Sequence, residues 1–186
     1  MRHLIITAHP SSKGFTHKIA KTFLHESHEN NAEAEILDLY NPRYSLDFLK
    51  FENIKNIKYD KIVDEIQDKI RLADNIVFVY PMWWYSFPGI FKNFIDKVFT
   101  NGFAFKNVKG NPIPVGLLKG KTCQVFTTCD GPWIYYAFVG RPGKNIIKLL
   151  CSFCGIKLKS YDILYSKSNR TENKLNSFLK MVERKV

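Results

Sequence analysis

The 186-residue sequence lacks the features that mark secreted, membrane-spanning and disordered proteins. It holds only 4 cysteines, too few to suggest the disulfide framework of a small secreted protein. No stretch approaches the ~18 consecutive apolar residues of a membrane helix, and no secretory signal pattern opens the chain. Hydrophobic residues make up 45 % of the chain, which argues against disorder. We therefore expect one domain over residues 1–186, located in the cytoplasm with reduced thiols.

Acidic residues are also scarce. The chain has 17 Asp and Glu against 28 Lys and Arg, which gives a formal net charge of +11. Such a field attracts anions, so nucleic acid, acidic lipid and phosphate-bearing cofactors are all candidate partners. The basic residues are scattered along the sequence instead of forming one run, which argues against nucleic acid.

Cys151 and Cys154 form a CxxC pattern. The pattern lies inside an expected helix, and no second matching pair accompanies it. We therefore predict no metal site and treat these thiols as small buried apolar groups.

Hydrophobic periodicity predicts alternating strands and helices. Apolar, β-branched runs predict strands at 3–8, 34–39, 75–80, 122–128 and 157–165. Helical spacing of apolar residues predicts helices from residue 16 and over 59–72, 87–99, 144–154 and 170–184, whereas 40–58, 100–120 and 129–142 are expected to be loops. This order predicts an α/β, flavodoxin-like three-layer sandwich with a five-stranded parallel sheet of order 2-1-3-4-5.

Three unusual segments follow the carboxyl ends of the central expected strands, where ligands of such sheets bind: residues 9–16, 81–87 and 128–142. The first precedes a helix, and its Lys13 and hydroxyl groups suit a phosphate at the positive end of the helix dipole. An ordinary loop with Thr16 as the helix N-cap is the alternative. The segment matches neither the GxGxxG pattern nor the P-loop pattern.

The other two segments are aromatic. Trp83 and Trp84 directly follow a strand and cannot both enter one core, so their rings suit a planar ligand, a lid or a subunit interface. In the third segment, Tyr135 and Tyr136 could donate hydrogen bonds to a developing anion, whereas Asp130 would oppose that anion if it pointed inward. A packed surface turn is the alternative for the third segment.

Residues 81–99, PMWWYSFPGIFKNFIDKVF, resemble the motif P-x-W-W-x-S-x-P-A-x-L-K-x-W-x-D-R-V-F of the flavodoxin-like NAD(P)H:quinone oxidoreductases. Residues 102–105, GFAF, resemble the G-F-A-Y that follows it, and the similarity continues in order from His9 to Gly155. The resemblance implies a bound flavin, either FAD or FMN, with NAD(P)H as co-substrate. It also implies a homodimer.

The resemblance further implies which residues hold the flavin. They are His9, Gly14, Phe15 and Thr16 on the phosphate and ribityl side, Pro81, Met82, Trp83, Trp84 and Tyr85 beside the isoalloxazine, and Thr127, Thr128 and Gly131 at its pyrimidine edge. Tyr135 or Tyr136 takes the place of the active-site tyrosine. The chain departs from the family at Gly14, where many members have Ser, at Thr16, where many have Asn, and at Cys129-Asp130, where a Gly-Gly pair is common. It shows no counterpart of the family's active-site histidine.

The implied activity is two-electron reduction of a quinone or a similar acceptor by a ping-pong mechanism, in which hydride passes from NAD(P)H through flavin N5. Tyrosine hydroxyls, with Arg141 or Lys144, could stabilise the charge that develops at N1/O2. Two alternatives remain: an ancillary subunit of a potassium-efflux transporter, and a flavodoxin-type electron carrier. Carriers of this type are usually acidic and contain a T-x-T-G-x-T loop, unlike this chain. The sequence does not distinguish FAD from FMN or NADH from NADPH.

Overall fold

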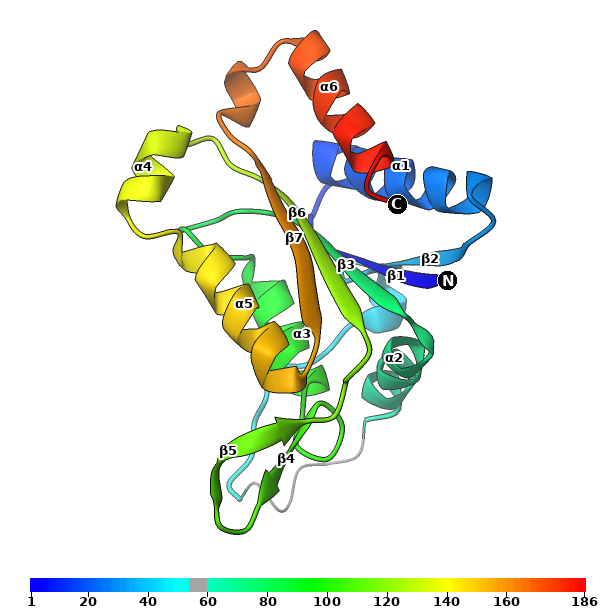
Figure 1. Cartoon of the computed structure of the whole chain (residues 1–186), viewed down its shortest axis with the longest axis vertical. Coiled ribbons are helices and arrows are strands. Elements are labelled where there is room, and N and C mark those ends of the chain that lie inside the picture. The colour runs from blue at the N-terminus through cyan, green and yellow to red at the C-terminus, as the bar shows by residue number, and fades with distance from the viewer. Residues whose placement is uncertain (54–59) are drawn as a thin grey trace.

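The computed structural model describes residues 1–53 and 60–186 (Figure 1). Its main sheet has five parallel strands in the order β2-β1-β3-β6-β7. These strands are β1 (Arg2–Thr7), β2 (Glu33–Asp38), β3 (Asn75–Pro81), β6 (Thr122–Thr128) and β7 (Lys157–Leu164). The numbering differs from the expected 2-1-3-4-5 because a separate hairpin, β4 and β5, precedes β6 in the chain.

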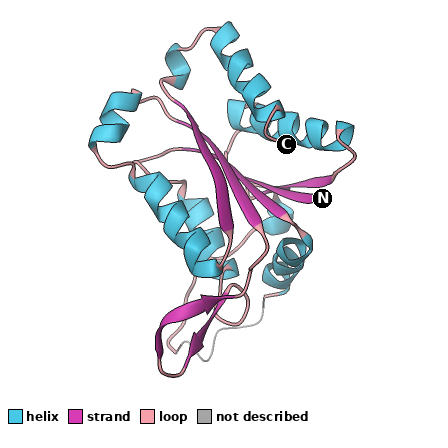
Figure 2. Ribbon diagram, viewed as in Figure 1, coloured by secondary structure: helices cyan, strands magenta, loops and turns pink. Residues whose placement is uncertain are grey.

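Helices cover both faces of this sheet (Figure 2). On one face lie α1 (Phe15–Glu29) and α6 (Glu172–Glu183), and on the other lie α2 (Lys61–Leu72), α3 (Gly89–Val98) and α5 (Pro142–Cys154). Asp60 caps α2, with its carboxylate accepting the N–H of Ile62 at 3.0 Å. The predicted start of this helix at residue 59, and part of the predicted loop 40–58, lie outside the described residues.

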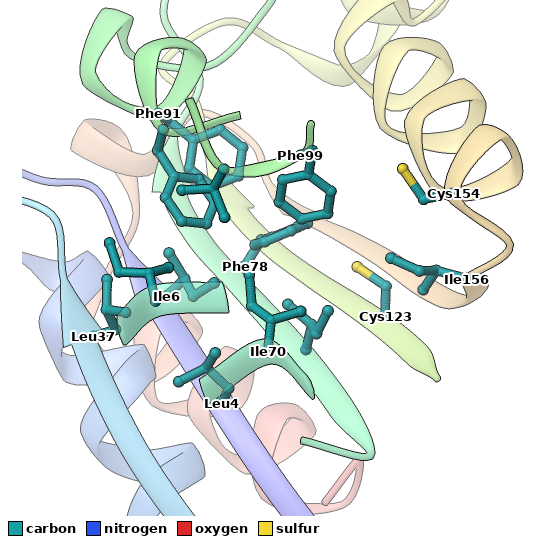
Figure 3. Packing of buried hydrophobic residues seen from close by; sticks show 14 of the residues in the cluster. Leu4, Ile6, Leu37, Ile70, Phe78, Phe91, Phe99, Cys123, Cys154 and Ile156 are labelled. Carbon is teal, nitrogen blue, oxygen red and sulfur yellow. The ribbon is translucent and has the colours of Figure 1, made fainter. Parts of the chain in front are cut away.

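Strand β3 lies at the centre of the sheet and is buried over its whole length. Its side chains alternate: Phe78 and Tyr80 pack among α2, α3 and α5, whereas Val77 and Val79 pack among α1 and α6. Figure 3 shows Phe78 packed with Phe91 of α3, where the two rings lie 4.9 Å apart. A parallel strand covered on both faces needs apolar residues at every position, which explains the continuous apolar run in its sequence.

Two segments expected to be loops contain regular structure. Within residues 100–120, β4 (Phe105–Val108) and β5 (Asn111–Gly116) form an antiparallel hairpin, and within 129–142 lies the short helix α4 (Trp133–Phe138). The hairpin and α4 lie at opposite ends of the main sheet (Figure 1). The strands are short and largely exposed, and Pro112 and Pro114 interrupt β5, so the sequence carries little β signal here.

The remaining regular segments of residues 1–53 and 60–186 are two 3₁₀ turns, η1 (Pro42–Tyr44) and η3 (Lys167–Asn169). No helix of the described chain is long and apolar enough to span a bilayer. The four cysteines are free thiols, and Cys151 and Cys154 are buried on the inner face of α5. The described residues contain no group of three His, Cys, Asp or Glu side chains placed to hold a metal ion.

Candidate functional site

The three unusual segments begin side by side at one edge of the sheet. Strands β1, β3 and β6 are neighbours, with Thr7 opposite Val79 and Pro81 opposite Thr128. Beyond the strand ends, the Met82 N–H donates to the Thr128 carbonyl at 2.7 Å. The sheet therefore brings the segments after β1, β3 and β6 together at the carboxyl ends of the strands, as the sequence predicted.

The segment after β1 leaves backbone donors free at the start of α1. Gly14 is the N-cap of this helix and makes no side-chain capping bond. Among the described residues, the N–H groups of Ser12, Lys13 and Phe15 have no protein acceptor. The alternative interpretation, with Thr16 as the N-cap, is wrong, because Thr16 is a buried residue inside the helix. Free N–H groups and the positive end of the helix dipole make this segment a suitable cradle for an anion.

Two histidines support this segment. The Ser11 N–H donates to His9 Nδ1 at 3.0 Å, and a Cβ on Gly14 would lie only 2.7 Å from His9 Cε1. His17 is buried, and its Nε2 donates to the His9 carbonyl at 3.3 Å and lies 3.9 Å from an Asp38 carboxylate oxygen. Sequence reasoning missed His17, although it occupies the buried face of the predicted helix beside Thr16.

The segment after β3 turns back on itself in an unusual conformation. The backbones of Trp83 and Ser86 exchange hydrogen bonds of 3.1 and 2.9 Å, so Trp84 and Tyr85 form a two-residue turn. Both have positive φ, +49° for Trp84 and +61° for Tyr85. Turns of this type favour Asn and Gly, and bulky residues there carry strain of the kind found at functional sites. The Trp84 side chain is 93 % exposed.

In the segment after β6, the carboxylate of Asp130 is held by η3. This carboxylate accepts the Ser168 N–H of η3 at 2.9 Å, and these hydrogen bonds from Ser168 lower the pKa of Asp130. Beside it, the Lys167 N–H donates to the Cys129 carbonyl, and the Ser166 N–H donates to the Gly131 carbonyl. The carboxylate is thus engaged with η3, and it joins the segment to the C-terminal part of the chain.

The structure separates the two candidate tyrosines. Tyr136 is buried, its hydroxyl accepts the Lys144 N–H at 3.1 Å, and burial raises its pKa. Tyr135 is half exposed, and its ring lies 5.9 Å from the ring of Tyr85. A hydrogen bond with Tyr135 raises the pKa of the Tyr85 hydroxyl. Tyr135 is thus the more exposed of the two candidates, and its hydroxyl faces that of Tyr85.

The segments after β3 and β6 together enclose a hollow of about 320 Å³, which we call the aromatic hollow. Its lining residues are Met82, Trp84, Tyr85, Cys129, Asp130, Gly131, Pro132, Tyr135 and Tyr136. Other predicted residues do not line it: His9, Gly14, Phe15 and Thr16 lie on the α1 side, whereas Pro81, Trp83, Thr127 and Thr128 lie beside it in the turn or sheet. Arg141 and Lys144, either of which could have stabilised the charge at N1/O2, line a different hollow.

Comparisons with known proteins agree with this architecture. Residues 1–182 match a family model described as a flavodoxin-like fold, and the chain belongs to that family. It is 36 % identical to an NAD(P)H oxidoreductase of Haemophilus influenzae, covering 88 % of this chain and 83 % of the relative. It is 32 % identical to an FMN-dependent NADH:quinone oxidoreductase of Bacillus velezensis, with coverages of 91 % and 88 %. A solved structure from Streptococcus mutans aligns with a TM-score of 0.84 and 28 % identity, covering 99 % and 97 % of the two chains.

Proposed function

We propose that the protein is a flavin-dependent NAD(P)H:quinone oxidoreductase. One observation carries the proposal: an open anion cradle and an aromatic hollow lie at the same edge of the sheet, where β1, β3 and β6 end. A flavin mononucleotide has a phosphate at one end and a flat ring at the other, so both features match its chemistry. The relative from Bacillus velezensis, named as FMN-dependent, supports FMN as the flavin.

The two ends of the flavin would bind different segments. The N–H groups of Ser12, Lys13 and Phe15, with the charge of Lys13, would hold the phosphate. The walls of the aromatic hollow, Trp84 and Tyr85 among them, would hold the ring. Gly14 fits this assignment because its missing side chain lets the segment close against His9.

When bound, the flavin supplies two-electron hydride chemistry between NAD(P)H and the acceptor. The chain would position the ring and place a donor beside it, because Tyr135 lines the hollow, is half exposed and carries a hydroxyl that can donate a hydrogen bond. Asp130 lines the hollow, and its carboxylate is held by the Ser168 N–H of η3.

The proposal includes a homodimer of single-domain chains in the cytoplasm. Large apolar side chains are exposed on α4, which borders the hollow, and on the outer face of α5, with Phe138 89 % and Leu149 69 % exposed. Apolar surface of this kind marks a protein contact. Sedimentation equilibrium tests the dimer, and a monomer at micromolar concentration would contradict it.

The direct test of the activity is the absorption spectrum of the purified protein from 300 to 550 nm. We expect a flavin spectrum that NADH or NADPH bleaches and a quinone restores, and mass analysis of the released chromophore identifies FMN or FAD. A spectrum that NAD(P)H leaves unchanged would favour an electron carrier. A colourless protein that also fails to bind added flavin would contradict the proposal.

A further inference from the structure

Gly143, the second residue of α5, lies where that helix meets the wall of the aromatic hollow. A Cβ at this position would lie 2.8 Å from the backbone carbonyl oxygen of Tyr85. It would also lie 3.2 Å from the Tyr161 hydroxyl and 3.3 Å from the Tyr136 hydroxyl. We propose that Gly143 is a positioning residue, whose missing side chain sets the place of the 83–86 turn against α5. This inference rests on the proposed function of the hollow.

Backbone conformation does not explain the glycine. Gly143 does not have a φ in the left-handed region, so alanine could adopt its backbone angles. Alanine is also the better helix former, so local preference favours it over glycine in α5. The close approach of the Tyr85 carbonyl is therefore the feature of the structure that requires glycine here.

The side of Gly143 away from the turn cannot give way easily. The Tyr136 hydroxyl accepts the Lys144 N–H at 3.1 Å, and the Tyr161 hydroxyl lies 3.2 Å from that of Tyr80. Tyr80 and Tyr136 are 1 % and 3 % exposed, so this group is fixed in a packed interior. The 83–86 turn lies at the surface and carries the exposed Trp84. An added methyl group at position 143 would therefore displace the turn rather than the tyrosines.

The displacement would act on one end of the bound flavin. Trp84 and Tyr85 form a wall of the aromatic hollow, after β3. The phosphate cradle lies at the start of α1, after β1. Gly143→Ala should therefore weaken binding of the ring and leave recognition of the phosphate unchanged. Riboflavin, which lacks the phosphate, and FMN should then lose affinity by the same factor.

The experiment is a fluorescence titration of the apoprotein with riboflavin and with FMN. We expect Gly143→Ala to raise both dissociation constants roughly tenfold, since small misplacements of a site are costly. Gly89→Ala is the matched control, because Gly89 lies in the first turn of α3 and has no atom within 4 Å of its Cβ position. It should change both constants less than about twofold, as expected for a site where a methyl group meets nothing.

Three outcomes would overturn the inference: wild-type affinities in Gly143→Ala, a loss confined to FMN, or an equal loss in Gly89→Ala. If Gly143→Ala shows no cooperative thermal unfolding, Tyr136→Phe takes its place, since it removes the acceptor that fixes Lys144 at the start of α5. Tyr136→Phe should weaken riboflavin and FMN by equal factors, and unchanged affinities would overturn the inference. A wild-type protein that binds neither flavin would instead refute the proposed function.

Discussion

The strained turn at Trp84 predicts that glycine is more stable than alanine at position 84, the reverse of the usual order. At ordinary helix and strand positions, glycine is less stable than alanine by about 0.5–1 kcal/mol. At position 84, φ is +49°, a conformation that costs a residue with a Cβ about 1 kcal/mol and costs glycine little. Trp84→Gly should therefore be more stable than Trp84→Ala by about 1 kcal/mol. Because the Trp84 side chain is 93 % exposed, removing its ring costs the apoprotein little burial in either variant.

Urea unfolding of the two apoproteins, followed by circular dichroism, measures this difference directly. A difference of about 1 kcal/mol corresponds to roughly 2–4 °C in melting temperature for a domain of this size. Both variants lose the ring and should bind FMN more weakly than the wild type. The reasoning fails if Trp84→Gly is as unstable as Trp84→Ala or less stable, because the turn would then hold no strain.

Two further predictions concern the segment after β6 and the buried thiols. Asp130→Ala should lower the free energy of unfolding at pH 7 by about 1 kcal/mol, as for a lost helix cap, while Asp130→Asn keeps the acceptor and costs less. Because the folded pKa of Asp130 is lowered, its contribution is fully present above the usual Asp pKa of about 4 and is lost as acid protonates the folded form, so the urea midpoints of wild type and Asp130→Ala should converge as the pH falls below that range. The exposed Asp47 is the control, and Asp47→Ala should leave stability nearly unchanged. Iodoacetamide at pH 8 should modify Cys129 before Cys154, whose pKa burial raises to about 12, and peptide masses showing equal rates would contradict this.

The parallel sheet could be predicted because its central strands are buried on both faces. Strand β3 is continuously apolar, and Pro81 ends it, so its position in the sequence is unambiguous. The hairpin β4–β5 could not be predicted in this way, since both strands are short and largely exposed and two prolines interrupt β5. Helix α4 has no buried stripe of helical period, because Tyr136 is its one buried residue and its other large side chains are exposed.

The position of the site could be predicted, but the roles of its residues only in part. The alternation of strands and helices along the chain predicted that the segments after β1, β3 and β6 lie at one edge of the sheet. The same pattern could not show that the Asp130 carboxylate accepts a hydrogen bond from Ser168 of η3, since the two residues are far apart in the sequence. Nor could it separate Tyr135 from Tyr136, because adjacent helical residues differ only in what packs around them. Gly143 carries no sequence motif, and its importance follows from a backbone contact across the fold.

The claim that these three segments form one flavin site is tested most directly by amide hydrogen exchange with and without FMN, read out by peptide mass. We predict that FMN slows exchange in residues 9–16, 81–87 and 128–136 together, because their free N–H groups and exposed backbone become covered. The β4–β5 hairpin, at the other end of the sheet, is the internal control and should exchange at the same rate in both conditions. Unchanged exchange in any one of the three segments, with FMN shown to be bound, would contradict the account.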